Sequence, residues 1–275
     1  MLANNNLPLN PYPSNPNIIG IIPARLASSR FPGKPLAKIC DVPMVGHVYF
    51  RSKMSKALRE VYVATCDKEI ADYVISIGGK AVMTSNTHER ASDRTAEAMI
   101  KIEQESEQRV DIAVMIQGDE PMLYHKMIDE AIKPIIEDKT VQIVNLMAPM
   151  KSRKEHEDLH EVKVVVDKKN YALYFSREPI PSWKKGAKSV PMLKQVCIIP
   201  FNRDFLIKFN ELEPTPLEIV ESVDMLRVLE YGYRVKMVLT EFSTYSVDTK
   251  EDLMEVEELM KTDKLISKYG IFPNN

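Results

Sequence analysis

The sequence predicts an α/β protein with a doubly wound, mostly parallel sheet. Through the first half of the chain, short apolar runs alternate with segments that carry apolar residues at helical spacing. The runs are nearly continuous, which is typical of strands buried on both faces, and their alternation with helices favours parallel strands. A chain of 275 residues with 44% hydrophobic content can form one large domain, or one domain with a sizeable insert.

The first strand and the loop after it organise the rest of the chain. Four of the five residues 18–22 are β-branched, which indicates a buried strand, and Pro23 is expected to end its pairing because proline lacks an N–H donor. The following loop holds three cations, Arg25, Arg30 and Lys34, a layout typical of a phosphate site at the carboxyl end of a strand. No Gly-rich phosphate motif is present, so side chains must supply the charge and a polyphosphate is the expected ligand. A solvated basic loop is the alternative.

The remaining elements of the first half follow the same alternation. Strands are expected at 61–65, 81–84 and 111–117, and helices at 44–56, 68–77 and 92–105. Gly78 and Gly79 are typical of a helix end, and Ser92 or Asp93 of a helix cap.

Antiparallel structure is expected after about Val141. Two strand-like runs at 162–167 and 171–177 flank a short polar segment, which indicates a hairpin. Further strands are expected at 195–201 and 234–239, and further helices at 217–230 and 250–261. The expected organisation is a disordered N-terminal tail at 1–17, one domain at 18–262 with an antiparallel insert at about 150–202, and a C-terminal tail at 263–275.

Composition and charge exclude several classes of function. A net charge of −2 gives no drive toward nucleic acid or an anionic membrane. No apolar run approaches the ~18 residues of a membrane span, and residues 1–17 lack the apolar core of a signal peptide. The three cysteines form no C-x-x-C pair and the five histidines show no ligand spacing, so we expect neither a disulfide framework nor a zinc site. The expected location is the cytoplasm.

Two acidic residues are candidate metal ligands. Asp119 follows the strand at 111–117 in a Gly-Asp-Glu-Pro segment, in the crevice where open α/β sheets bind ligands. Asp248 precedes the last helix, where the residue pattern by itself favours an N-cap paired with Glu251. If the two carboxylates converge, they suit Mg²⁺, which takes one or two carboxylates plus phosphate oxygens.

Six segments of the chain form a recognisable series. They are Ile-Pro-Ala-Arg-x4-Arg-Phe-Pro-Gly-Lys-Pro-Leu at 22–36, Gln-Gly-Asp-Glu-Pro at 117–121, Ala-Leu-Tyr-Phe-Ser-Arg at 172–177, Pro-x-Pro-Leu-Glu at 214–218, Leu-Arg-Val-Leu-Glu-Tyr-Gly at 226–232 and Val-Asp-Thr at 247–249. In this order and spacing, from about Ile18 to Met260, the chain resembles the 3-deoxy-manno-octulosonate cytidylyltransferase family, also called CMP-Kdo synthetases.

The resemblance implies a Rossmann-like nucleotidyltransferase fold and a reaction in which CTP and a 2-keto-3-deoxy sugar acid give CMP-sugar and pyrophosphate, with Mg²⁺ as cofactor. The sugar 2-hydroxyl would attack the α-phosphorus in line, so positioning and charge neutralisation matter more than a covalent nucleophile. By resemblance, the nucleotide-binding residues are Pro23, Ala24, Arg25, Arg30, Lys34, Arg94 and Gln117. The catalytic residues are Arg25, Lys34, Asp119 and Asp248, and the two aspartates would hold the metal.

The same resemblance assigns the sugar-binding residues Arg177, Gln195, Glu218 and Met225. Two of these depart from the family pattern, since Gln195 replaces a His and Met225 a Gln, and Ile199 replaces a nearby Tyr. The expected substrate is therefore Kdo or a Kdo-like acid. The alternatives are a nonulosonate, an amino-substituted Kdo, or a nucleotide-binding paralogue without turnover. The family also implies a homodimer formed through the hairpin at 162–177.

Overall fold

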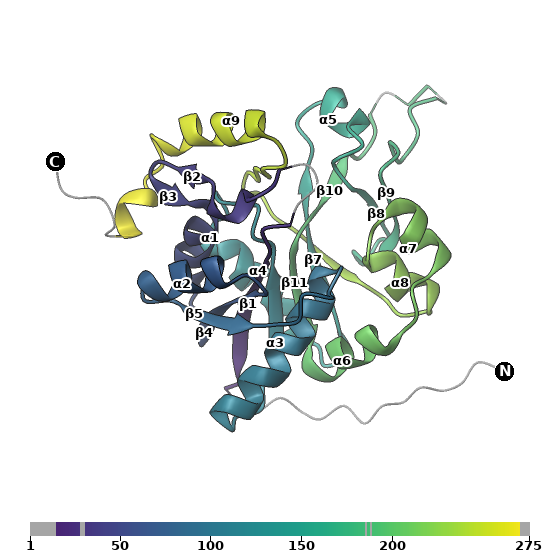
Figure 1. The fold of residues 1–275 in the computed structure, drawn as a ribbon. Coiled ribbons are helices and arrows are strands. Elements are labelled where there is room, and N and C mark those ends of the chain that lie inside the picture. Colours follow the sequence, from purple (N-terminus) through teal and green to yellow (C-terminus); the bar gives the residue numbers. More distant parts are fainter. Residues whose placement is uncertain (1–14, 28–30, 185, 188, 270–275) are drawn as a thin grey trace.

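The computed structural model describes residues 15–27, 31–184, 186–187 and 189–269, and its centre is a five-stranded sheet (Figure 1). The strand order is β11-β6-β1-β4-β5. β1 (Ile18–Ala24), β4 (Glu60–Thr65), β5 (Lys80–Met83) and β6 (Ile112–Ile116) run parallel, and β11 (Ile198–Asn202) pairs with β6 in the opposite direction. The doubly wound, mostly parallel sheet predicted from the sequence is confirmed.

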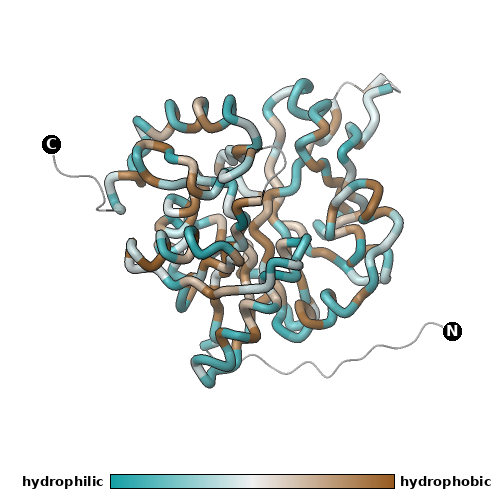
Figure 2. Tube along the Cα trace, viewed as in Figure 1, coloured by the Kyte–Doolittle hydropathy of each residue, from teal (hydrophilic) through white to brown (hydrophobic). Residues whose placement is uncertain are grey.

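Helices cover both faces of this sheet. α1 (Met44–Lys53), α2 (Lys68–Ser76) and α4 (His125–Glu137) pack on one face, and α3 (Ala91–Ser106) and α6 (Arg203–Glu211) on the other. Successive side chains of a strand point to opposite faces. Ile18 and Ile22 of β1 therefore join one apolar cluster, and Ile19 and Ile21 join the other. Figure 2 shows the apolar residues concentrated on these central strands.

A second sheet carries most of the antiparallel structure, in the order β12-β7-β10-β8-β9. Its members are β7 (Val144–Pro149), β8 (Lys163–Val166), β9 (Ala172–Ser176), β10 (Leu193–Val196) and β12 (Lys236–Leu239). β8 and β9 form the expected hairpin, whereas β12 and β7 are parallel. An antiparallel bridge between Ile143 and Phe201 joins this sheet to the first.

Short helices and a small ribbon complete the fold. α5 (Arg153–Glu157), α7 (Pro216–Glu221) and α8 (Met225–Glu230) lie beside the second sheet (Figure 1). α9 (Lys250–Met260) packs over the ribbon of β2 (Lys38–Ile39) and β3 (Val42–Pro43), and two 3₁₀ turns are η1 (Lys34–Leu36) and η2 (Ile266–Tyr269). None of the helices in the described ranges is both long enough and apolar enough to cross a bilayer.

The two ends of the chain are only partly described. The N-terminal tail at 1–14 and residues 270–275 lie outside the described residues. Residues 263–269, expected as part of a tail, pack against α1, where Asp263 forms an ion pair with the buried Arg51. Tyr269 stacks on Phe50 of the same helix.

Two predicted elements each divide in two. The strand expected at 195–201 breaks at Cys197, because β10 pairs with β7 in the second sheet and β11 pairs with β6 in the first. The helix expected at 217–230 breaks at Ser222, whose φ of 53° ends α7. The neighbouring strands and helices set both breaks, so apolar spacing does not reveal them.

Pro23 does not end the pairing of β1, as the sequence had suggested. It stays opposite Ala64 of β4, while the ladder with β6 already ends at Ile21. Proline has no N–H, so it is tolerated in a strand where no neighbouring strand needs to accept a hydrogen bond from that position. Four elements, α4, β7, α5 and α6, lie outside the strands and helices predicted from the sequence. In α4 an internal proline, Pro134, obscures an otherwise helical spacing.

Candidate active site

A cavity of about 510 Å³ opens at the carboxyl ends of β1 and β6, the edge where open α/β sheets bind ligands. Its walls come from the loops after these strands, the start of α3, the junction of β10 and β11, the break between α7 and α8, and the segment before α9. Both sheets therefore contribute to one site.

Lys34 holds two carboxylates together at this cavity. Its Nζ lies 3.0 Å from Asp119 Oδ2 and 3.3 Å from Asp248 Oδ1, and it donates to the carbonyl oxygen of Val247 at 2.8 Å. Both carboxylates contact one nitrogen atom, although they lie far apart in the sequence. The structure thus brings together the two candidate metal ligands and one of the candidate phosphate-binding cations.

Backbone geometry on both sides fixes this cluster. Gly33 has a φ of 75°, a left-handed value that glycine adopts without strain, and its N–H donates to Leu26 O at 3.0 Å, which closes the cationic loop. On the other side, the N–H of Val247 donates to Asp119 O at 2.9 Å. This bond places Asp248 next to the end of β6.

Asp248 does not cap α9, which was the alternative for this residue. Thr249 is the N-cap: its Oγ1 accepts from Asp252 N, and Asp252 Oδ2 accepts from the N–H groups of Asp248 and Thr249. Asp252 thus has the role expected of Glu251. Because the helix is capped one residue further on, the Asp248 carboxylate lines the cavity instead.

The two carboxylates suit a divalent ion that also binds phosphate. Asp119 Oδ1 is buried and has no hydrogen-bond partner in the described part of the chain, so it keeps a lone pair for a further ligand. Within the described ranges, no cluster of three or more His, Cys, Asp or Glu side chains could hold a metal alone. An ion here would complete its coordination with ligand oxygens, which matches the preference of Mg²⁺.

Most of the nucleotide-binding candidates line the same cavity. These are Pro23, Ala24, Arg25, Lys34, Arg94 and Gln117, whereas Arg30 lies outside the described residues. Arg25 Nη1 donates to His88 O at 3.3 Å. Arg94 is buried, with Nη1 on Thr84 Oγ1, and its Nη2 has no partner among the residues described. A buried guanidinium nitrogen left unpaired is costly unless a ligand accepts from it.

Arg177 is the cation best placed for an acidic substrate. Its guanidinium donates to four main-chain carbonyls, Glu221 O at 2.8 Å, Leu159 O at 3.0 Å, and His160 O and Ser222 O at 3.5 Å each. It forms no ion pair with a carboxylate of the described chain. In contrast, Lys194 on the same side pairs with two glutamates, at 2.8 and 2.9 Å.

Two further sugar-binding candidates lie on the Arg177 side. Gln195 and Met225 both line the cavity, as does Ile199 from β11. Gln195 Nε2 donates to Asn145 Oδ1 at 2.6 Å, so its side-chain orientation is fixed by the second sheet. Met225 is almost completely buried, and it offers this wall an apolar surface without a hydrogen-bond donor.

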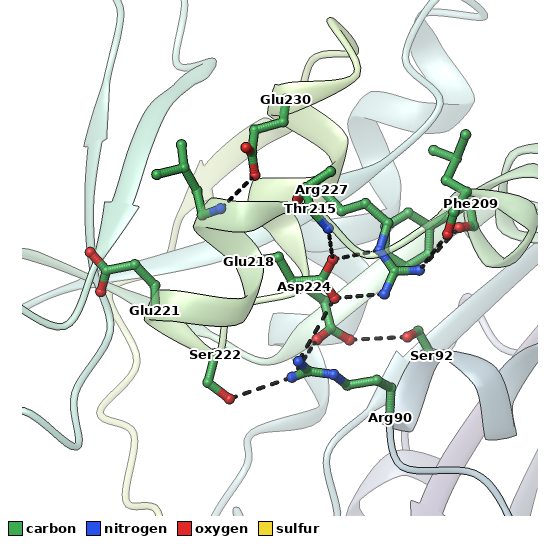
Figure 3. A network of polar contacts seen from close by, with 12 residues as sticks. Arg90, Ser92, Phe209, Thr215, Glu218, Glu221, Ser222, Asp224, Arg227 and Glu230 are labelled. Carbon is green, nitrogen blue, oxygen red and sulfur yellow. Dashed lines mark hydrogen bonds and ion pairs between the residues drawn. The ribbon is translucent and has the colours of Figure 1, made fainter.

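Glu218, the fourth sugar-binding candidate, belongs to a buried ion-pair network instead (Figure 3). Its two oxygens accept from Arg227 Nε and Nη2 at 2.6 Å each, and the side chain is fully buried. It is not among the residues that line the cavity, so its expected contact with a sugar stays a prediction. The break at Ser222 separates it from Met225, because residues 218 and 225 no longer share one face of a continuous helix.

Two charged residues that the sequence did not single out, Arg90 and Asp224, also line the cavity. Arg90 Nη1 lies 3.2 Å from Asp224 Oδ1, and Ser92 Oγ donates to Asp224 Oδ2 at 3.0 Å (Figure 3). Ser92 is therefore not the cap of α3, whose N-cap residue is Arg90. The position of Asp224, directly before Met225, was the signal that could have indicated it.

Two partly buried residues in the wall have side chains with raised pKa values. Burial raises the pKa of Glu120 to about 7, and the neighbouring charge of Asp119 adds to the shift. Burial also raises the pKa of the Cys197 thiol well above its usual range. Cys197 therefore stays protonated at neutral pH and is a poor nucleophile, so the wall offers no activated thiol for covalent chemistry.

Transfer of a nucleotidyl group requires that a polyphosphate be held in line with its acceptor while its negative charge is neutralised. This sheet edge provides such a binding place. Its cations lie after β1, and its two carboxylates lie after β6 and before α9. The fold and the site together define a nucleotidyltransferase.

Comparison with known proteins gives the family. A family model described as cytidylyltransferase matches residues 19–263. The 3-deoxy-manno-octulosonate cytidylyltransferase of Geotalea uraniireducens is 43% identical over 254 residues, which cover 89% of this chain and 99% of the relative. That of Geobacter metallireducens is 42% identical over 251 residues, with 88% and 96% covered.

A solved structure agrees with these relatives. CMP:2-keto-3-deoxy-manno-octonic acid synthetase complexed with CTP aligns with a TM-score of 0.82 and 36% identity, covering 89% of this chain and 98% of that chain. The chain belongs to the 3-deoxy-manno-octulosonate cytidylyltransferase family, as its sequence motifs indicated.

Proposed function

We propose that the chain transfers CMP from CTP to 3-deoxy-manno-octulosonate (Kdo), giving CMP-Kdo and pyrophosphate. The observation that carries the proposal is the contact of Asp119 and Asp248 with one Lys34 nitrogen, in the same cavity as Arg177. The first feature suits a metal-bound triphosphate, and the second suits the carboxylate of a sugar acid. Relatives that match nearly the whole chain carry names that support the same substrates.

In the proposed reaction the chain positions charges rather than forming a covalent bond. The sugar 2-hydroxyl attacks the α-phosphorus, and pyrophosphate leaves on the opposite side. Arg25 and Lys34 donate to phosphate oxygens and offset the charge that develops on the leaving group. Asp119 and Asp248 would hold Mg²⁺, which neutralises phosphate charge and lowers the pKa of a coordinated hydroxyl when it is bound. Arg30, in the same loop, remains a prediction.

Recognition of the two substrates is assigned to opposite sides of the cavity. On the nucleotide side, the unpaired Nη2 of Arg94 is a donor for the carbonyl and ring-nitrogen acceptors of cytosine, with Gln117 beside the base. On the sugar side, Arg177 binds the carboxylate through its planar fork. The carboxylate is attached to the carbon that bears the 2-hydroxyl, so holding it also aims the attacking oxygen. Gln195 and Met225 contact the rest of the sugar.

We also propose a homodimer located in the cytoplasm. Leu173 on β9, an edge strand of the second sheet, is 62% exposed, and Ile219 and Val220 on α7 are 62% and 80% exposed. Only the start of β9 pairs on this side, through the bond from Ala172 N–H to Val235 O. Apolar side chains beside such a strand edge are typical of an interaction surface. The three cysteines are free, which favours a reducing compartment.

Pyrophosphate release by the purified chain tests the substrates. We would combine CTP, UTP or ATP with Kdo, an amino-substituted Kdo or a nonulosonate, each with and without Mg²⁺. The highest kcat/KM is expected for CTP with Kdo in the presence of Mg²⁺. A higher value for one of the other sugar acids would replace Kdo as the substrate and would point to Gln195 and Met225 as the cause. Binding of CTP without turnover of any sugar acid would contradict the proposal.

A further inference from the structure

We propose that Lys34 is a tethered occupant of the metal site. Its ammonium group fills the cation position between Asp119 and Asp248 until a triphosphate draws it away, so that nucleotide and metal bind cooperatively. The inference rests on the proposed function, which assigns both ligands to this cavity.

The ammonium group of Lys34 already has the surroundings of a bound cation. Three oxygens, from Asp119, Val247 and Asp248, lie 2.8 to 3.3 Å from Nζ. An ammonium has three N–H donors and no acceptor, so these oxygens match all of its donors. The Lys34 side chain is only 14% exposed, so water replaces little of this coordination.

A divalent ion and this ammonium group cannot occupy the position together. A Mg²⁺ ion that both Asp119 and Asp248 held would lie between the same two carboxylates that Nζ now contacts. Two cations so close would repel strongly in a partly buried site. Metal binding therefore requires Lys34 to move away from Asp119 and Asp248.

A triphosphate gives Lys34 another place to bind. Lysine is a compact charge on a flexible four-carbon stem, so Nζ can move by rotamer changes alone. The hydrogen bond from Gly33 N–H to Leu26 O anchors the backbone beside Lys34 while this happens. Phosphate oxygens would replace the carboxylates as partners of Nζ, and the vacated position would accept the metal. If nucleotide binding raises the affinity for the metal by some factor, metal binding must raise the affinity for the nucleotide by the same factor.

Two simpler accounts make different predictions. If Lys34 were a permanent structural strut, its removal would destabilise the fold without improving metal binding. If it acted only through long-range charge, removing any cation of the cavity would improve metal binding by a similar factor. Arg25 distinguishes the last case, because it lies in the same loop and cavity but has no contact with Asp119 or Asp248 among the described interactions.

The experiment is a titration of Mn²⁺ into nucleotide-free, sugar-free protein, with free Mn²⁺ measured by electron paramagnetic resonance. We compare wild type, Lys34→Met, Arg25→Met and the double variant Lys34→Met/Asp248→Asn. Lys34→Met should bind Mn²⁺ at least about tenfold more tightly than wild type. This factor is expected if the ammonium group is away from the metal position in about a tenth of the wild-type molecules or fewer. Arg25→Met should change the Kd by less than about threefold, and the double variant should lose the gain.

Each result decides the matter. Lys34→Met binding Mn²⁺ no more tightly than wild type, or Arg25→Met showing an equal gain, would overturn the proposal. Thermal unfolding of Lys34→Met shows whether this variant is folded. If it is misfolded, Lys34→Gln is used in its place. Pyrophosphate release by wild type reports separately on the proposed function, since the titration contains neither substrate. An enzyme that makes CMP-Kdo while Lys34→Met shows no gain would refute the tethered occupant alone.

Discussion

Arg177 is oriented by main-chain carbonyls from two segments, so its charge remains for a ligand. Replacing it by lysine keeps the charge but removes the planar fork that binds a carboxylate through two hydrogen bonds. We expect R177K to raise the KM for the sugar acid by about 10- to 100-fold, the range of one or two charged hydrogen bonds. The KM for CTP should change by less than about twofold.

Steady-state pyrophosphate release, with each substrate varied in turn, measures both constants. R234K is the matched control, because Arg234 is an exposed arginine that pairs with Asp167 away from the cavity. If R177K left the sugar KM unchanged, Arg177 would not be the residue that binds the carboxylate.

Asp119 is the second residue whose replacement is informative. D119N keeps the size of the side chain but removes the charge that Lys34 contacts and that a metal would need. We expect kcat/KM to fall by at least about a hundredfold, the typical loss when one group that stabilises developing charge is removed. D72N, at an exposed aspartate paired with Lys68 on α2, should keep full activity. An active D119N enzyme would contradict a metal role for Asp119.

At the residue scale, the sequence could identify side chains whose position depends on a short local segment. Asp119 directly follows a buried strand, and Lys34 lies in a loop after another, so both were predictable as cavity residues. Glu218 and Asp224 were not, because each lies beside the helix break at Ser222. Glu218 contacts Arg227, whereas Asp224 lines the cavity. This difference depends on packing against α6 and α3, which no local sequence pattern predicts.

At the scale of elements, one buried ion pair ties α7 to α8. Arg227 donates both to Glu218 and to the carbonyl oxygens of Phe209 and Leu212, which end α6. Replacing Arg227 by methionine would leave Glu218 buried without its partner. We expect R227M to lower the free energy of unfolding by about 3 to 5 kcal/mol, and the double variant E218L/R227M to lose much less, because no unpaired charge remains.

Urea unfolding followed by circular dichroism measures these differences. R153M, which breaks an exposed pair with Glu157 on α5, should cost less than about 0.5 kcal/mol. Equal losses in R227M and the double variant would show that packing of the arginine stem, and not the unpaired carboxylate, is responsible.

The contact between α1 and the strand β2 makes stability depend on pH. His47 is buried, its Nε2 bonds to Ile39 O at 2.8 Å, and burial lowers its pKa to about 4. Because the ordinary pKa is about 6.5, the unfolded chain takes up a proton between these values that the folded chain does not. The stability is therefore complete above about pH 6.5 and falls as the pH drops toward 4. We expect a loss of about 2 kcal/mol between pH 7 and pH 5 from this group.

Urea unfolding at the two pH values tests this expectation. H47Q can keep a donor for Ile39 O but has no proton to gain, so its stability should change less between pH 7 and pH 5. H160Q, at an exposed histidine, should retain the wild-type difference. A pH dependence of H47Q equal to that of wild type would assign the acid sensitivity to other groups.

Strands and helices were predictable from the sequence where their own residues mark both of their ends. β1, β4 and β6 are short apolar runs with polar ends, and α2 ends at two glycines, so their positions agree with the prediction to within one or two residues. The run that became β10 and β11 has the same character, yet it divides at Cys197 because its two halves meet different sheets. Hydrophobic patterning states that a segment is buried but not which partner buries it.

At the scale of the whole molecule, the exposed apolar residues of β9 and α7 predict an assembly. L173D/V220D should convert the proposed homodimer to a monomer, because each buried aspartate would lie in the interface without a partner. Light scattering after size-exclusion chromatography gives the mass in solution. M254D changes a similarly exposed methionine on α9 and should leave the dimer intact. A wild-type chain that is monomeric at micromolar concentration would contradict the proposed assembly.

The overall architecture was predictable because alternating strands and helices favour a parallel sheet in almost any packing. The union of two sheets was not predictable. It depends on one bridge between Ile143 and Phe201 and on a parallel pair, β12 with β7, formed by strands far apart in the sequence. The consequence for the site is direct, because Gln195 and Arg177 come from the second sheet while Lys34 and Asp119 come from the first.

The bond between Val247 and Asp119 has a consequence for biosynthesis. A ribosome makes the strand that carries Asp119 long before it makes the segment that carries Asp248. Competence for catalysis therefore arises late in translation, and any product released before that segment has emerged would lack half of the acidic pair.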